Sequence, residues 1–313
     1  MIKKECFTAE WIEQVSSELH YNDKNLIEKV IRALSLLEML VKAGCPLVFK
    51  GGTALMLILG KSAHRLSIDI DLICPPGTNI EDYLKSFADF GFINLELVER
   101  KQRDDADIPK SHSKFFYQIA YRNDTDAQSY ILLDVLYEDI HYFRTQQIAI
   151  NCPFIRLEGK PLMVTVPSAE DILGDKLTAF APNTTGIPYY RNGRSCSMEI
   201  AKQLYDVGRL FENVSDLQIT KEAFRKIAVV ELSYRSFGTD IGQVFNDIRQ
   251  TALCISTRGK AGEGDFDLIQ DGIIRVKSFM YKQRYLIDHA IIDAARAAYL
   301  ATLIEKGINE IES

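Results

Sequence analysis

One short segment constrains the fold of this chain more than any other. Residues 47–49 form an apolar run that ends at Gly51 and Gly52, and residues 53–59 are apolar and compatible with a helix. Residues 66–73 then alternate between apolar and polar side chains with a period of two, which predicts a strand. The segment therefore predicts a strand, a glycine turn, a helix and a second strand in succession, as in an α+β domain built around a sheet.

The glycine pair in this segment is a candidate phosphate-binding site. Gly51 and Gly52 allow the backbone to approach an anion closely, and the free N–H groups and dipole of the helix start favour phosphate. Thr53 can add a hydroxyl group. Taken alone, a glycine pair is more often a simple tight turn.

Two carboxylates follow on the alternating run. Ser67, Asp69 and Asp71 are predicted to project from one face of the strand, because side chains two positions apart point the same way. The intervening positions, predicted to face the core, are Ile68, Ile70 and Leu72. Adjacent carboxylates repel one another unless a cation lies between them, and such oxygen-rich pairs suit Mg²⁺. The alternative is an ordinary solvent-facing side of an amphipathic strand.

A third carboxylate, Asp134, lies within an apolar β-forming run at residues 130–137. Together with residues 115–121 this run predicts a hairpin with a long turn. If the strand of Asp134 lies beside that of Asp69 and Asp71, the three carboxylates converge. They could then hold two Mg²⁺ ions for an in-line displacement at phosphorus.

Helical patterns begin and end the chain. The expected division is a mixed sheet-and-helix domain over residues 1–160 and a helical domain over residues 161–313 that completes the active-site cleft. Ser168 and Asp171 predict the cap that opens the helix after Pro167. The expected helices cover residues 8–20, 24–43, 80–90, 169–180, 197–213, 220–236, 240–255, 266–280 and 284–306, with an extended run at 92–99 and long polar loops at 181–195 and 257–265.

Composition narrows the class of protein without identifying it. The 313 residues carry a formal net charge of −6, so any contact with nucleic acid needs a local basic patch. The six cysteines show no zinc-binding spacing, which favours reduced thiols in a cytoplasmic protein. No apolar run is long enough to cross a bilayer, so no membrane partner is expected.

The order of these motifs resembles that of nucleotidyltransferases of the polymerase-β superfamily, and more narrowly the AbiEii/AbiGii toxin family related to the MenT toxins. The family pattern is GG[ST], a helix, and then R-x-S-x-D-x-D. The matching residues are Gly51, Gly52, Thr53, Arg65, Ser67, Asp69 and Asp71, with Asp134 at the later strand carboxylate. The family also carries a helical lysine and a later helical aspartate, which correspond to Lys176 and Asp206. Here the loop between these two is longer and contains Gly and Pro.

The resemblance implies a nucleotidyltransferase fold and a set of roles. Asp69, Asp71 and Asp134 would hold two Mg²⁺ ions, and Gly51, Gly52, Thr53, Arg65, Ser67 and Lys176 would bind the nucleotide. Asp206 would orient Lys176 or the acceptor. The substrate would be a nucleoside triphosphate, the acceptor an RNA such as tRNA, and the biological role that of a toxin with a cognate antitoxin, in a toxin–antitoxin or phage-defence pair. The alternatives are nucleotide transfer to a protein hydroxyl and a non-catalytic nucleotide-binding module.

Overall fold

The computed structural model describes residues 1–97, 110–121, 127–214, 216–235, 238 and 240–309. The chain divides into two compact units, each of which is discontinuous in sequence. The first unit comprises Met1–Ile140, Thr145–Pro167 and Phe279–Gln283, and the second comprises His141–Arg144, Ser168–Ser278 and Arg284–Ser313.

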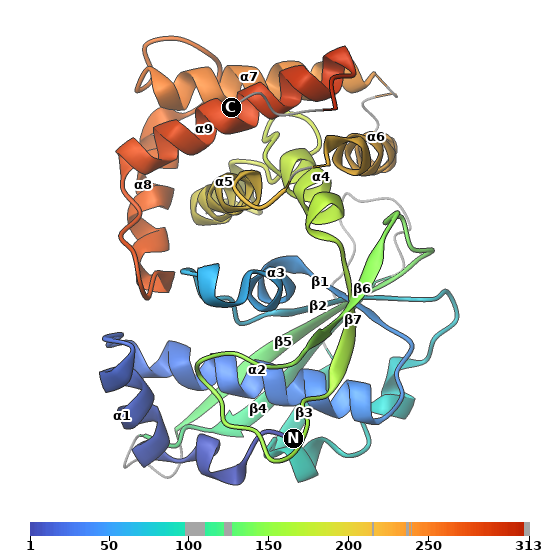
Figure 1. Cartoon of the computed structure of the whole chain (residues 1–313), viewed down its shortest axis with the longest axis vertical. Coiled ribbons are helices and arrows are strands. Elements are labelled where there is room, and N and C mark those ends of the chain that lie inside the picture. Colours follow the sequence, from blue (N-terminus) through green and yellow to red (C-terminus); the bar gives the residue numbers. More distant parts are fainter. Residues whose placement is uncertain (98–109, 122–126, 215, 236–237, 239, 310–313) are drawn as a thin grey trace. The chain divides into compact units, whose positions relative to one another are not determined.

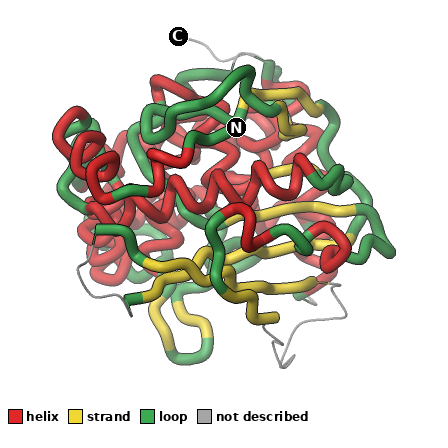
Figure 2. Tube along the Cα trace, turned by 90° about the horizontal axis from the view of Figure 1, so that it is seen from below, coloured by secondary structure: helices red, strands yellow, loops and turns green. Residues whose placement is uncertain are grey.

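A five-stranded mixed sheet organises the first unit (Figure 1). Its strands, in the order β1-β2-β5-β4-β3, are β1 (Val48–Lys50), β2 (Ile70–Cys74), β5 (Gln128–Tyr137), β4 (Lys110–Gln118) and β3 (Asn94–Leu97). β2 and β5 are parallel, and the other neighbouring pairs are antiparallel. Figure 2, which colours strands yellow, shows the elements from a second direction. The predicted hairpin is confirmed as β4 and β5, and the predicted α+β class is confirmed.

Alternation within the strands determines which face of the sheet is buried. On β5 the buried positions are Ile131, Leu133 and Val135, and the intervening side chains are partly or largely exposed. Helix α2 (Lys24–Lys42), which contacts β2 and β5, buries an apolar stripe and is capped by Asp23, whose carboxylate accepts the N–H of Leu26 at 3.0 Å. The other α-helices among the described residues of this unit are α1 (Ala9–Glu18) and α3 (Gly51–Leu59). A two-stranded sheet pairs β6 (Thr145–Ala149) with β7 (Met163–Pro167).

Two predictions within the first unit are wrong in detail. The strand expected over residues 66–73 begins only at Ile70, because the preceding backbone bonds to a different segment: the N–H of Leu66 donates to the carbonyl of Phe279 at 2.8 Å. Ile68 is accordingly only half-buried. The helix expected over residues 80–90 is replaced by two short 3-10 helices, Ile80–Tyr83 and Phe87–Phe90. The extended run expected at 92–99 is β3, and its last two residues lie outside the described residues.

The second unit is helical, as predicted for this part of the chain (Figure 1). Its helices are α4 (Ala169–Ala179), α5 (Ser197–Phe211), α6 (Leu217–Tyr234), α7 (Ile241–Ser256), α8 (Phe266–Val276) and α9 (Ile287–Lys306). The predicted cap of α4 is confirmed: Ser168 Oγ accepts the N–H of Asp171 at 3.1 Å. The Asp171 carboxylate also accepts the backbone N–H groups of Phe143 and Arg144, which ties that segment to the helix.

All six cysteines are free thiols. Of the helices in the described part of the chain, none combines the length and apolar character that crossing a membrane requires.

Candidate active site on the sheet

Four polar side chains form a row across the sheet. Lys50 on β1 pairs in register with Asp71 on β2, Asp71 pairs with Asp134 on β5, and Asp134 pairs with His112 on β4. Register partners on neighbouring strands project from the same face of a sheet. All four residues are partly exposed, whereas the residues beside them in sequence that face the other way are buried: Phe49, Ile70, Leu133 and Ser113.

The glycine pair lies directly against this row. Gly51 has a φ of 79°, and a Cβ atom built on it would lie 2.1 Å from Oδ2 of Asp71. A Cβ atom on Gly52 would lie 2.7 Å from Oγ of Ser67 and 2.9 Å from Nη2 of Arg65. Both positions therefore require glycine, because any side chain would displace a group of the candidate site. The structure thus brings together six of the residues that the sequence singled out: Gly51, Gly52, Arg65, Ser67, Asp71 and Asp134.

Thr53 holds part of the backbone of this site in place. Its side chain is fully buried, and its hydroxyl donates to the backbone carbonyl of Asp69 at 2.7 Å. The sequence predicted that this hydroxyl would contribute to phosphate binding, whereas the structure uses it to fix the segment that carries Asp69 and leads into β2. Arg65 is also buried, and its Nη1 donates to the carbonyl of Leu66 at 3.0 Å.

Two members of the row, Lys50 and His112, were missed by sequence reasoning. His112 Nδ1 lies 2.5 Å from Oδ1 of Asp134, and its side chain is more buried than that of Asp134, at 12% against 34% exposure. The position of Lys50 next to Gly51 was a signal that could have been used. No local pattern points to His112, because only the register of β4 against β5 brings it to Asp134.

The carboxylates of this row could bind a cation together with the phosphates of a substrate. In the described ranges, no three His, Cys, Asp or Glu side chains are grouped so that they could hold a metal ion by themselves. Asp71 and Asp134 nevertheless place two carboxylates at one register position of adjacent strands. Mg²⁺ is commonly bound by one or two carboxylates together with water and substrate phosphates, rather than by a cage made only of protein. The residues on the sheet fit that mode of binding.

Lys176 and Asp206, the two predicted helical residues, form a buried ion pair within the second unit. Lys176 on α4 places its Nζ 3.0 Å from Oδ2 of Asp206 on α5, and the two side chains are 9% and 2% exposed. Lys176 Nζ also donates to Oε1 of Gln203 at 2.9 Å. Neither residue is therefore an ordinary charge on a helix surface. A buried ion pair contributes little net stability, since desolvation offsets the attraction between the charges.

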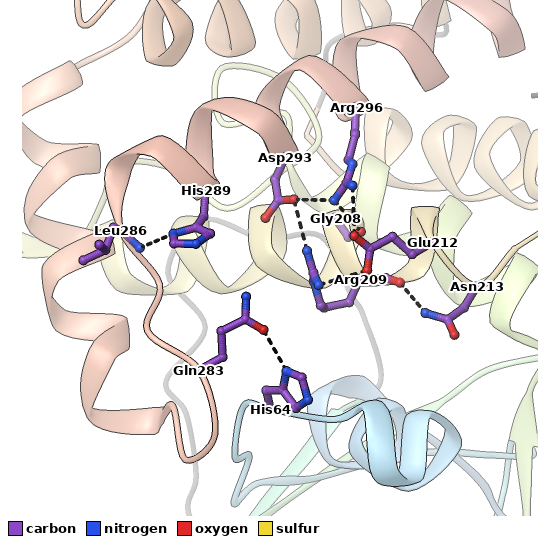
Figure 3. A network of polar contacts seen from close by, with 10 residues as sticks. All are labelled: His64, Gly208, Arg209, Glu212, Asn213, Gln283, Leu286, His289, Asp293 and Arg296. Carbon is purple, nitrogen blue, oxygen red and sulfur yellow. Dashed lines mark hydrogen bonds and ion pairs between the residues drawn. The ribbon is translucent and has the colours of Figure 1, made fainter. Parts of the chain in front are cut away.

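A polar network fixes α5 against α9 just beyond Asp206 (Figure 3). A Cβ atom on Gly208 would lie 2.0 Å from Oδ1 of Asp293, so the two helices can approach this closely only at a glycine. Asp293 pairs with Arg296 at 3.1 Å and with Arg209 at 3.7 Å, and both arginines also contact Glu212 at 2.9 Å. Burial raises the pKa of the Asp293 carboxyl, and the two arginines oppose this shift.

A mixed sheet in which a helix starts at a glycine pair beside two paired carboxylates is the arrangement expected of a nucleotidyltransferase. The family model described as the nucleotidyl transferase AbiEii toxin of a type IV toxin–antitoxin system matches residues 34–285. The chain belongs to this family. Membership implies a nucleotide substrate and an antitoxin partner.

A solved structure with low sequence identity has a similar fold. MenT4, a nucleotidyltransferase toxin from Mycobacterium tuberculosis H37Rv, is 13% identical with a TM-score of 0.50, and the match covers 94% of this chain and 89% of that one. JHP933 from Helicobacter pylori is 16% identical with a TM-score of 0.48, and the match covers 90% and 94% of the two chains. None of the curated proteins matches the chain.

Proposed function

We propose that this nucleotidyltransferase transfers a nucleoside monophosphate from a nucleoside triphosphate to an RNA hydroxyl, with tRNA as the expected acceptor, and that it acts as the toxin of a toxin–antitoxin or phage-defence pair. One observation carries the assignment of the site: Gly51, at the start of α3, lies so close to the Asp71 carboxylate that a Cβ atom would be 2.1 Å from it. A phosphate bound at the start of α3 would therefore lie beside the carboxylates.

Each group on the sheet has a part in this proposal. The N–H groups at the start of α3 bind the phosphates of the nucleotide, and Lys50 and Arg65 add positive charge around the glycine pair. Asp69, Asp71 and Asp134 would hold Mg²⁺, which neutralises phosphate charge when it is bound. Thr53 keeps Asp69 in place through its backbone carbonyl.

The reaction is a displacement at the α-phosphorus. The oxygen of the acceptor hydroxyl forms a bond to this phosphorus, the bond between the α- and β-phosphates breaks, and pyrophosphate leaves. The hydroxyl proton passes to the Asp134–His112 pair, whose two side chains lie within hydrogen-bond distance. The family resemblance gives Lys176 the role of neutralising charge on the triphosphate, and within the second unit Asp206 orients Lys176 through their ion pair.

The test is incubation of the full chain with each labelled nucleoside triphosphate, Mg²⁺ and total cellular RNA and protein. The expected product loses its label on RNase treatment and keeps it on protease treatment. Asp71→Asn should lower the rate of labelling by about 100- to 1,000-fold, whereas Asp89→Asn, a change of an exposed carboxylate in the same unit, should not. A label removed only by protease would instead support transfer to a protein hydroxyl. Nucleotide binding without Mg²⁺-dependent turnover would support the non-catalytic module.

A further inference from the structure

The loop between α4 and α5, which was predicted only as a long polar loop, contains a β-hairpin. β8 (Tyr190–Arg191) pairs with β9 (Arg194–Ser195), and the two turn residues, Asn192 and Gly193, have φ values of 52° and 73°. Two successive residues with positive φ make a type I′ turn, for which Asn-Gly is a favoured sequence. The hairpin is therefore specified locally.

The base of the hairpin is fixed to the second unit, while its tip is exposed. Ser195 Oγ donates to Ser197 Oγ at 3.0 Å, and Ser197 Oγ donates to Oδ2 of Asp271 on α8 at 3.4 Å. Beyond these bonds, Arg191, Asn192, Gly193 and Arg194 are all exposed, and Tyr190 is 57% exposed. An anchored hairpin thus presents one aromatic and two guanidinium groups.

The charges on the hairpin are not explained by the stability of the fold. Arg191 and Arg194 are register partners, and like charges directly opposite one another destabilise a hairpin. Among the described residues neither arginine has an ion-pair partner. No acidic residue occurs from position 182 to position 198, in a chain whose net charge is −6. A polyanion would supply the missing negative charge.

We propose that this hairpin binds the single-stranded 3′ end of the RNA acceptor, with a base stacked on Tyr190 and phosphates held by Arg191 and Arg194. This inference rests on the proposed function. An exposed aromatic ring next to arginines is the combination with which proteins hold single-stranded nucleic acid, because rings stack on bases and guanidinium groups bind phosphates.

The geometry favours a single strand over a duplex. Neighbouring residues of a strand point to opposite faces, so Tyr190 lies on one face of the hairpin and the register pair Arg191 and Arg194 on the other. A rigid duplex could contact only one of these faces. A flexible strand can pass around the edge of the hairpin and use both. β9 leads directly into α5, along which Ser197 and Asp206 are about 14 Å apart.

The experiment measures binding of a short RNA with a free 3′ hydroxyl by fluorescence anisotropy, as a single strand and as a blunt duplex of the same sequence. Tyr190→Ala should weaken single-strand binding roughly 10- to 100-fold, and Tyr190→Phe should restore it. The double variant Arg191→Gln/Arg194→Gln should reduce the slope of log affinity against log salt by about 1.4. The matched control, Lys260→Gln/Lys277→Gln, removes two exposed charges elsewhere in the same unit.

The outcomes separate this inference from the proposed function. If the unaltered protein labels RNA, and the hairpin variants bind and label it equally well with the parent salt slope, the hairpin inference is overturned. If the unaltered protein neither binds nor labels RNA, the proposed function itself fails. Weaker binding of the duplex than of the single strand, with an unchanged KM for the nucleotide in the hairpin variants, supports the inference. Preferential binding of the duplex contradicts it.

Discussion

Asp71 and Asp134 face each other at one register position of the parallel strands β2 and β5. Two carboxylates held side by side repel one another, and the repulsion is strongest where the surroundings exclude water. This repulsion occurs where the start of α3 at Gly51 also lies against Asp71. A pair of like charges breaks a local rule of stability, and natural proteins break such rules mainly at functional sites.

Replacing either carboxylate of this pair should separate activity from stability. Asp71→Asn and Asp134→Asn are each expected to lower kcat by about 100- to 1,000-fold, because each removes preorganised charge at the reacting phosphate. The fold should survive in both variants, since asparagine has nearly the same shape as aspartate and each substitution relieves repulsion between the carboxylates. Turnover with labelled nucleotide and thermal denaturation provide the two readouts. Near-normal turnover of either variant would refute the role of that residue.

Gly51→Ala should inactivate the enzyme. Gly44→Ala is the control that separates the effect of backbone strain from the effect of the new Cβ atom on the site. Gly51 and Gly44 have φ values of 79° and 75°, so alanine at either position should cost about 1–2 kcal/mol of backbone strain. Only at Gly51 would the new Cβ meet a neighbour, the Asp71 carboxylate, since nothing lies within 4 Å of a Cβ at Gly44. Denaturant titration should show that both variants remain folded, and activity assays should show a loss of activity only in Gly51→Ala.

The Lys176–Asp206 pair should show strong coupling in a double-mutant cycle. Lys176→Met leaves the buried Asp206 carboxylate without its cation, which should cost about 3–5 kcal/mol of unfolding free energy. The double variant Lys176→Met/Asp206→Leu should recover most of that loss, because it removes both buried charges.

Activity decides whether the pair has more than a structural role. The double variant is expected to fold and to remain inactive, as measured by urea denaturation and by nucleotide transfer. If it transfers nucleotide at the parent rate, Lys176 and Asp206 are a structural pair and the proposed roles are wrong.

Glu38 should make stability depend on pH in a defined direction. Burial raises the pKa of this carboxyl, opposed by the N–H of Ile2, the N-terminal amine and Lys42. The folded state therefore binds the proton more tightly than the unfolded chain does. The resulting stability is fully present below the unfolded pKa, about 4.3, and is lost as the pH rises through the folded value.

Glu38→Gln should remove this dependence. The variant should match the parent near pH 4 and exceed its unfolding free energy at pH 8, because no charge is buried, while the amide oxygen can still accept the N–H of Ile2. Urea denaturation at the two pH values gives the comparison. A variant that is less stable than the parent at pH 8 would show that the ionised carboxylate is net stabilising.

The sequence by itself determined the features that a few neighbouring residues encode. The strand, glycine pair and helix around Gly51, the cap at Asp23 and the cap at Ser168 all follow from local periodicity and local hydrogen bonding. The β4–β5 hairpin was predictable for the same reason. The type I′ turn at Asn192 and Gly193 was equally local, and its Asn-Gly signal was overlooked within a polar loop.

Only the tertiary structure decided which of these features meet. The parallel pairing of β2 with β5 joins Asp71 to Asp134, and the register of β4 adds His112. The packing of α4 against α5 buries Lys176 against Asp206. Such contacts depend on apolar surface gathered from distant parts of the chain, and no window of neighbouring residues contains that information. Local sequence patterns therefore identified the candidate residues, and long-range packing determined which of them lie together.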